Sequence, residues 1–196
     1  MLDWPAPSFT PEPSLRELAM HFTADAIAII LQAPRANVEA HWPLVAEALE
    51  ALKILDPAVE VAAIASIGSE SYLFAPEKEA GSEAYFRRMY EFDRGLGNIE
   101  SGDGAKYCGR GFVPLVGRSG YARFGKLVGV DLVDRPDLAM DPAVAARILA
   151  YDFMLKGVPK AVAEDDWVKV RRLVHGDLSG WKRFNGILIP LLKLLP

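Results

Sequence analysis

The stretch that most constrains the fold is residues 57–70, PAVEVAAIASIGSE, which is apolar on most of its sides. Asp56 followed by Pro57 is a typical helix start, because the aspartate side chain can accept hydrogen bonds from free N–H groups and proline fits the first helical position. A helix that is apolar all round is a buried helix. The sequence therefore predicts a buried helix over 57–70.

Glu70 stands at the end of this predicted helix. Carboxylates are seldom buried without a partner, so Glu70 is the most informative acid in the chain. One interpretation is an exposed helix end, where the glutamate simply meets water. The other is a catalytic acid, because apolar surroundings favour the protonated form of a carboxyl group, which is the form that a general acid requires.

The rest of the chain reads as mainly helical, with only residues 105–116 able to form a small hairpin. Residues 1–13 are rich in proline and are expected to be extended. Residues 71–101 are polar and read as an excursion between two lobes. The other expected helices, with their capping or terminating residues, are 14–33 (Ser14, Pro34), 38–54 (Asn37), 119–128 (Ser119, Gly129), 142–156 (Asp141, Gly157), 164–175 (Gly176) and one opened by Ser179.

Residues 102–125, GDGAKYCGRGFVPLVGRSGYARFG, concentrate glycine among aromatic and arginine side chains. Several glycines together predict positive φ angles or a backbone that passes close to another group. Guanidinium and aromatic groups beside them can hydrogen-bond to and stack on a polar ring compound. The plainer interpretation is a glycine-rich connection. A phosphate-binding loop is excluded, because no Gly-Lys-Ser/Thr follows and the G-x-G-x-x-G spacing is absent.

The sequence YCGRGFVPLVGRSGYARFG resembles the signature of glycoside hydrolase family 19, whose usual form is YxGRGxIQLTGRxNYxxFG. The segment VGVDLVDRPDLAMDPAVAARIL at 128–149 is similar to the phage and bacterial endolysin branch of that family. IASIGSES at 64–71 occupies the place of the family's helix ending in His-Glu-Ser/Thr, and RRLVHGDLSGWKRF at 171–184 resembles RRxVNGGxNGxxxF. The resemblance covers roughly residues 20–190.

This resemblance implies a mainly α, lysozyme-like, two-lobed domain over 14–196, with a cleft floored by 102–121. It also implies inverting hydrolysis, in which an acid and a base stand about 6.5–9.5 Å apart to admit a water molecule. Glu70 would be the acid. Glu79 is the first choice for the base, with Glu91 and Asp103 as alternatives. The residues expected to bind substrate are Tyr107, Arg110, Gly111, Phe112, Val116, Arg118, Tyr121 and His175.

The chain departs from the family pattern at several polar positions. Pro114 and Val116 replace the Gln and Thr of IQLT, and Val116 has the shape of threonine without its hydroxyl group. Since that hydroxyl helps to hold the water, its loss could lower the rate by orders of magnitude. The other departures are Ser69 for His, Gly120 for Asn and His175 for the Asn of the late Asn-Gly motif.

Composition limits the other classes of function. The net charge of −4 argues against a nucleic-acid-binding protein, although a local basic cluster could face an anionic wall polymer. Cys108 is the only cysteine, so no internal disulfide is possible, and no residue set has convincing metal-ligand spacing. We expect no cofactor and a monomer. No apolar run reaches the roughly 18 residues of a membrane span.

Three functional hypotheses follow. The first is a bacteriolytic, endolysin-like hydrolase of β-1,4 bonds between N-acetylated sugars, with peptidoglycan as substrate. The second is a weakened glycan-binding relative, suggested by Pro114 and Val116, and the third is a chitinase. The start of the chain lacks a basic segment followed by an apolar run, so we expect synthesis in the cytoplasm (of the host, if the gene is phage-borne) and action at the bacterial cell wall.

Overall fold

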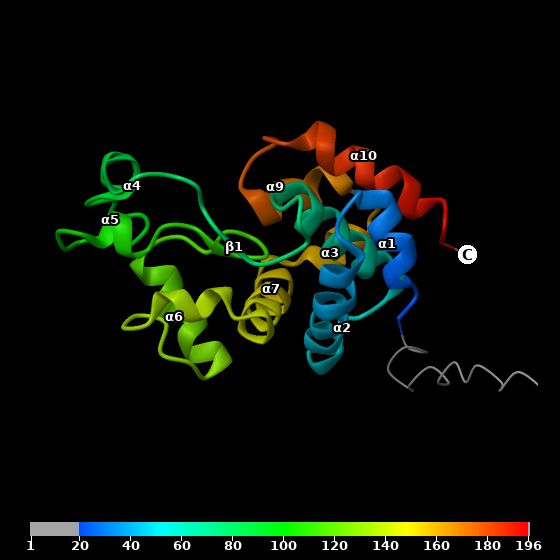
Figure 1. The fold of residues 1–196 in the computed structure, drawn as a ribbon, viewed down its shortest axis with the longest axis horizontal. Helices are drawn as coiled ribbons and strands as arrows, with labels where there is room; N and C mark the ends of the chain where they lie inside the picture. Colours follow the sequence, from blue (N-terminus) through cyan, green and yellow to red (C-terminus); the bar gives the residue numbers. More distant parts are fainter. Residues whose placement is uncertain (1–19, 196) are drawn as a thin grey trace, which may run out of the picture.

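The computed structural model describes residues 20–195, so the proline-rich segment 1–13 and the expected cap Ser14 lie outside the described residues. The described part is mainly α, as predicted, and forms two lobes (Figure 1). Its helices are α1 (Ala24–Leu31), α2 (Arg35–Ala51), α3 (Pro57–Glu70), α4 (Glu83–Tyr90), α5 (Asp103–Lys106), α6 (Arg118–Val128), the 3₁₀ helix η1 (Pro136–Met140), α7 (Pro142–Lys156), α8 (Val158–Ala163), α9 (Trp167–His175) and α10 (Trp181–Leu192).

Helix α3 forms the centre of the larger lobe, which contains α1, α2, α8, α9 and α10 (Figure 1). The predicted bounds are confirmed, and the Asp56 carboxylate accepts from the N–H groups of Ala58 and Val59. Every residue from Val59 to Gly68 is buried. This run includes Glu60, whose carboxylate accepts from backbone N–H groups of the segment before α1; burial raises the pKa of Glu60. The sequence pattern therefore placed the core helix correctly.

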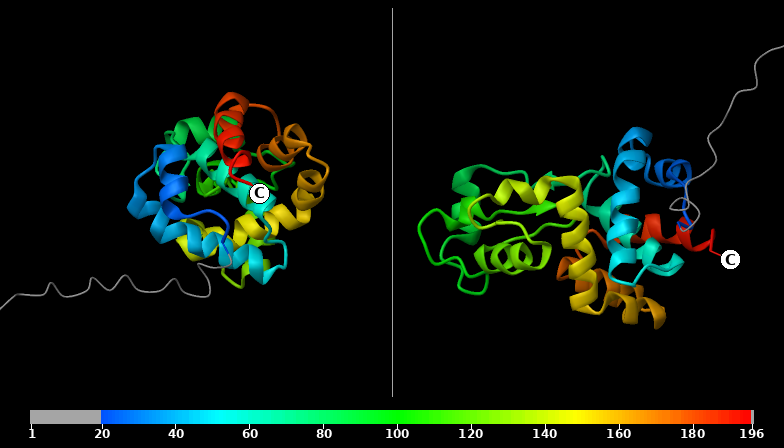
Figure 2. Two further views of the ribbon diagram at one scale, coloured as in Figure 1. Left: turned by 90° about the vertical axis from the view of Figure 1, so that its right-hand side faces the viewer. Right: turned by 90° about the horizontal axis from the view of Figure 1, so that it is seen from below.

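Helix α7 joins the two lobes, and in the view from below it runs between them (Figure 2). Its residues Val144 and Ile148 pack in the apolar cluster of the smaller lobe, whereas Leu149 and Phe153 pack in the cluster of the larger lobe. The helix begins with an Asp141 cap and ends at Gly157 in the left-handed conformation, as predicted. Because α7 contributes to both cores, the two lobes share one rigid element.

The smaller lobe contains a two-stranded antiparallel sheet beside α4, α5 and α6. Strand β1 (Glu77–Lys78) pairs with β2 (Arg110–Gly111), and Arg110 also forms a bridge with Leu115. Of the expected hairpin over 105–116, the structure therefore contains the single bridge between Arg110 and Leu115. The main partner strand comes from the polar segment 71–101, and this pairing brings residue 79 against the glycine-rich block.

Several helix boundaries differ from the prediction because side chains expected to cap helices bind elsewhere. Asn37 lies inside α2, which begins after Pro34, and its amide donates to the carbonyl of Leu73. The hydroxyl of Ser119 donates to the carbonyl of Leu96, and α6 begins at Arg118, after the N-cap Gly117 with φ +83°. Ser179 does not cap α10, whose N-cap is Gly180.

The remaining differences concern short helices. Helix α1 begins at Ala24, after the N-cap Thr23, so the described residues 20–23 of the expected helix 14–33 are not helical. Helix α4 lies within the polar segment 71–101, where no helix was expected. The expected helix 164–175 begins later in the structure, as α9 at Trp167, after the N-cap Asp166. A separate short helix, α8, precedes α9.

Candidate active site

Glu70 is the last residue of α3, and its side chain is 15 % exposed. Two residues of α9 approach the same carboxylate oxygen, Oε1: Arg171 Nη1 donates to it at 2.7 Å, and His175 Nδ1 lies 3.1 Å away. Arg171 and His175 are four positions apart and so share one face of α9. The surroundings of Glu70 are therefore cationic and polar, and the expectation of an apolar pocket around it was wrong.

Arg171 is buried, and its guanidinium is held from both sides. Nη1 also donates to the hydroxyl of Ser69 at 2.9 Å. On the other edge Nε donates to the carbonyl of Ser179 at 2.9 Å, and Nη2 donates to the same oxygen. Gly180 has φ +70°, a conformation that favours glycine, and a Cβ there would lie 2.8 Å from Nη2. Sequence reasoning missed Arg171, although its spacing from His175 in a predicted helix was a usable signal.

Glu79 directly follows β1, and both of its carboxylate oxygens accept hydrogen bonds. The hydroxyl of Tyr90 donates to Oε1 at 2.9 Å, and the backbone N–H of Gly109 donates to Oε2 at 3.1 Å. Burial and the neighbouring Glu79 raise the pKa of Tyr90, which keeps its hydroxyl protonated as a donor. A Cβ at Gly109 would lie 3.0 Å from Oε2 of Glu79 and 3.1 Å from Cβ of Pro114. This is a close backbone approach of the kind predicted for the glycine-rich block.

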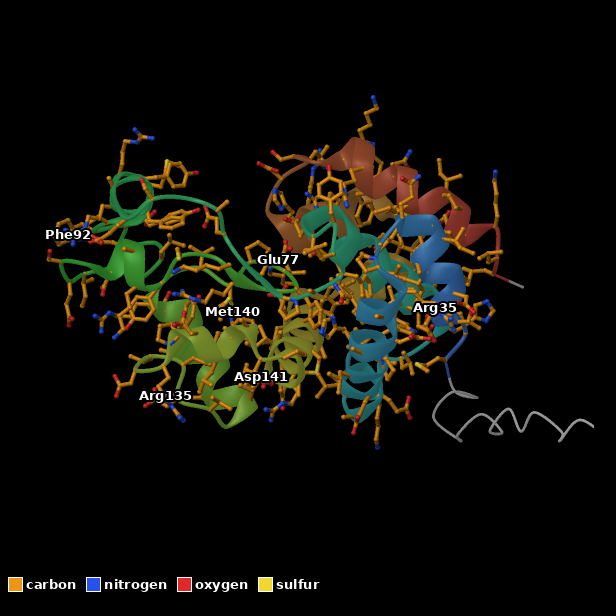
Figure 3. The ribbon with its side chains drawn as sticks, viewed as in Figure 1. Arg35, Glu77, Phe92, Arg135, Met140 and Asp141 are labelled. Carbon is orange, nitrogen blue, oxygen red and sulfur yellow. The ribbon has the colours of Figure 1, made fainter. Side chains whose placement is uncertain are left out.

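Glu70 and Glu79 line the same pocket, which has a volume of about 300 Å³ and lies between the lobes. The two acids come from different elements: Glu70 ends α3 in the larger lobe, and Glu79 follows β1 in the sheet of the smaller lobe (Figure 1). Glu77, labelled in Figure 3, is in the same stretch between the lobes. The lining residues are Glu70, Ser71, Glu77, Lys78, Glu79, Ala80, Gly111, Phe112 and Pro114.

The two alternative bases are engaged elsewhere in the smaller lobe. Glu91 accepts from the N–H groups of Gly102 at 2.7 Å and Gly104 at 2.9 Å, and these bonds lower its pKa. Asp103 is buried; although burial opposes its charge, the hydrogen bonds from Arg118 and from backbone N–H groups lower its pKa. Neither acid lines the pocket of Glu70. Both stabilise the turn that opens the glycine-rich block.

Most of the aromatic and arginine residues expected to bind substrate are buried within the smaller lobe. Tyr107 and Tyr121 expose none of their surface. Arg110 is also buried, where it donates to the hydroxyl of Tyr121, to the carbonyl of Cys108 and to Asp137. These three residues cannot contact a sugar in this structure, so the expectation that they bind substrate is corrected. They pack inside the smaller lobe and stabilise the backbone of the glycine-rich block.

The other expected substrate-binding residues divide into three groups. Arg118 forms a salt bridge with Asp103 and is a structural residue. Phe112 is almost fully buried in the core of the larger lobe but, with Gly111, lines the pocket of Glu70. Val116 and His175 line a second cavity of about 410 Å³. Pro114 lines both cavities, which makes it the boundary between them.

Over residues 20–195, no group of three or more His, Cys, Asp or Glu side chains is arranged to hold a metal ion. Within the same residues, no helix has both the length and the apolar character needed to cross a bilayer.

Comparison with known protein families found no family model that matches the chain. A curated relative from Haemophilus influenzae, described as a "Glycosyl hydrolase family 19 domain-containing protein", is 30 % identical over 108 residues. The match covers 55 % of this chain and 52 % of the relative, so the chain spans about half the length of the curated relative. This distant likeness agrees, at the level of the family, with the resemblance seen in the sequence motifs.

Proposed function

We propose that this protein is a glycoside hydrolase that cleaves β-1,4 bonds between N-acetylated sugars, acting on peptidoglycan at the bacterial cell wall. The observation that carries the proposal is that two carboxylates with different partners, Glu70 and Glu79, line one pocket between the lobes. Glycosidic hydrolysis needs such a pair, one acid to protonate the leaving oxygen and one base to activate water.

Glu70 is the proposed general acid because of its position in the pocket; the apolar surroundings that would favour a protonated carboxyl group are absent. Its Oε1 is occupied by Arg171 and His175, whereas no residue between 20 and 195 hydrogen-bonds to Oε2. Oε2 is thus the oxygen that can present a proton to the leaving glycosidic oxygen. The contacts to Oε1 fix the direction of the carboxyl group, and geometry of this kind supplies much of the barrier reduction in enzymes.

Glu79 is the proposed general base. Its carboxylate oxygens accept hydrogen bonds from the Tyr90 hydroxyl and from the N–H of Gly109, and these two donors fix the orientation of the group that would accept a proton from water. In an inverting reaction this water attacks the sugar from the side opposite the leaving group. Glu91 and Asp103 are less suited, because their oxygens accept backbone N–H groups outside the pocket.

A second candidate function is glycan binding with little turnover. It is favoured by the apolar Pro114 and Val116, which line the cavities where the resemblance implies amide and hydroxyl groups. A protein of this kind would retain the cleft but position the attacking water poorly.

The test is hydrolysis by the wild-type chain and by Glu70→Gln. We expect the wild type to reduce the turbidity of permeabilised bacteria and to release reducing ends from purified peptidoglycan. Glu70→Gln should lose about 10³-fold or more in turnover, because the amide cannot donate a proton in the same way. The matched control is Glu83→Gln, an exposed acid of α4 whose partner is Arg87.

The outcome distinguishes the candidates. Equal turnover by wild type and Glu70→Gln would remove Glu70 as the acid, and binding of peptidoglycan fragments without reducing-end release would favour the binding protein. Faster release from chitin oligosaccharides than from peptidoglycan would assign a chitinase. NMR of the first product tests inversion, since a retained anomeric configuration contradicts the assigned base.

A further inference from the structure

The cavity of about 410 Å³ is larger than the pocket of the two carboxylates and is not used by the proposed reaction. It lies between α6 of the smaller lobe, the joining helix α7, and α9. Pro114 borders both spaces, and His175 lines the cavity while its Nδ1 approaches Glu70. A glycan that reaches Glu70 and Glu79 therefore passes next to this cavity.

The cavity combines apolar walls with unbalanced charge. Arg123 is exposed on α6, and its guanidinium has no hydrogen bond or ion pair with any residue of the range 20–195, although its charge acts on the carboxylate of Asp152. Asp152 on α7 is 14 % exposed, and Lys156 Nζ lies 3.0 Å from its Oδ2 and also donates to the carbonyl of Val174. Burial raises the pKa of Asp152. The apolar lining includes Val116, Phe124, Ile148, Leu149, Leu155 and Leu173.

The two cations of the cavity are not equivalent. Lys156 is already committed to Asp152 and to a backbone carbonyl, so its charge is largely balanced. Arg123 acts on Asp152 through its charge but makes no hydrogen bond with the described residues, so its planar guanidinium keeps its donors for a ligand. A guanidinium is the group best suited to bind a carboxylate through two parallel hydrogen bonds. The apolar walls next to it suit small alkyl groups. The ligand that fits is a short chain that carries both methyl groups and a carboxylate.

We propose that this cavity binds the lactyl-peptide arm of the N-acetylmuramic acid unit, with Arg123 pairing with a carboxylate of the arm. This inference rests on the proposed function, because it assumes that glycan occupies the neighbouring pocket. Peptidoglycan carries such arms along its strands, whereas chitin has the same β-1,4 backbone and N-acetyl groups without them. The cavity is thus the determinant of preference for peptidoglycan over chitin.

The test measures binding by the Glu70→Gln variant, so that the glycan stays intact. Calorimetry compares a peptidoglycan disaccharide that retains its peptide arm with a chitin disaccharide. We expect tighter binding of the ligand with the arm, and an additional Arg123→Gln change should weaken that binding about tenfold, as for one charge-assisted hydrogen-bonding pair. Binding of the chitin disaccharide should not change.

The control is Arg94→Gln, which removes the same charge from an exposed position in the smaller lobe that lines neither cavity. Equal affinity of Arg123→Gln and its parent for the arm-bearing ligand overturns the proposal, and so does an equal loss for both ligands. Failure of the hydrolase proposal is seen separately, as absence of reducing-end release by the wild type. If the wild type releases no reducing ends but Arg123→Gln still weakens binding of the arm-bearing ligand alone, the result supports the proposed binding site without hydrolysis.

Discussion

The guanidinium of Arg171 donates to Oε1 of Glu70 at 2.7 Å, although 101 positions separate the two residues in the sequence. Arg171 is buried and is itself held by Ser69 and by the carbonyl of Ser179. The acid at the end of the core helix is therefore oriented by a cation from α9. Four consequences of this and related contacts can be tested.

Replacement of Arg171 should affect both stability and turnover. Arg171→Ala leaves the partly buried Glu70 carboxylate without its cation, and loss of one partner of a buried pair costs about 3–5 kcal/mol in unfolding free energy. Arg171→Lys keeps the charge, but an ammonium group cannot reach Ser69, Glu70 and Ser179 together, so kcat should fall about 10- to 100-fold. Urea unfolding and steady-state kinetics measure the two effects. Arg172→Lys, at the exposed neighbouring position, should change neither.

Removal of the Tyr90 hydroxyl should weaken the proposed base. Tyr90→Phe deletes the donor to Oε1 of Glu79, which leaves that carboxylate with Gly109 N–H as its remaining hydrogen-bond donor within residues 20–195. We expect kcat to fall about tenfold, with a loss of roughly 1 kcal/mol in stability. Tyr85→Phe on the same helix is the control, because no described residue hydrogen-bonds to the Tyr85 hydroxyl. If both variants keep wild-type kcat, the hydroxyl of Tyr90 does not orient the base.

An added methyl group at Gly109 should displace Glu79. The Cβ of Gly109→Ala would meet Oε2 of Glu79 at 3.0 Å and Cβ of Pro114 at 3.1 Å, so one of these neighbours must move. If the Glu79 carboxylate moves away from the added methyl group, the proposed base is misplaced, and kcat should fall about 10- to 100-fold. Gly186→Ala in α10 is the matched control, because its Cβ meets no atom within 4 Å, and this change should leave kcat unaltered. An unchanged kcat in Gly109→Ala would show that turnover does not depend on the contact between Glu79 and Gly109.

The acid sensitivity of the smaller lobe should depend on Asp103. Its folded-state pKa lies below the unperturbed value of 3.8, because its bonds to Arg118, Glu100 N–H and Ile99 N–H outweigh the opposing effect of burial. The stability that its charge contributes is therefore complete above pH 3.8 and is lost as the pH falls through the lower, folded-state pKa. Asp103→Asn should lower the urea midpoint at pH 7 and flatten the decrease below pH 4. An unchanged acid decrease in Asp103→Asn would assign the effect to other carboxylates.

Local sequence signals predicted the elements whose ends and faces are set by nearby residues. The Asp-Pro starts at Asp56 and Asp141 and the glycine end at Gly157 gave correct bounds for α3 and α7. The same logic failed for Asn37, Ser119 and Ser179, because a polar side chain or carbonyl near a helix start has several possible partners. In this fold those partners, Leu73, Leu96 and Arg171, come from other elements.

Local signals in the sequence were enough to predict a buried helix ending in Glu70 and a glycine-rich block with room for close backbone approach, because periodicity, caps and glycine content act over a few residues. The packing of distant segments, in contrast, brings Glu79 into the pocket of Glu70 and sets Arg171 against the acid. It also decided that Tyr107, Arg110 and Tyr121 point into the smaller lobe. Burial and pairing depend on which distant segments pack together. A short motif contains no information about which of its side chains those segments will bury.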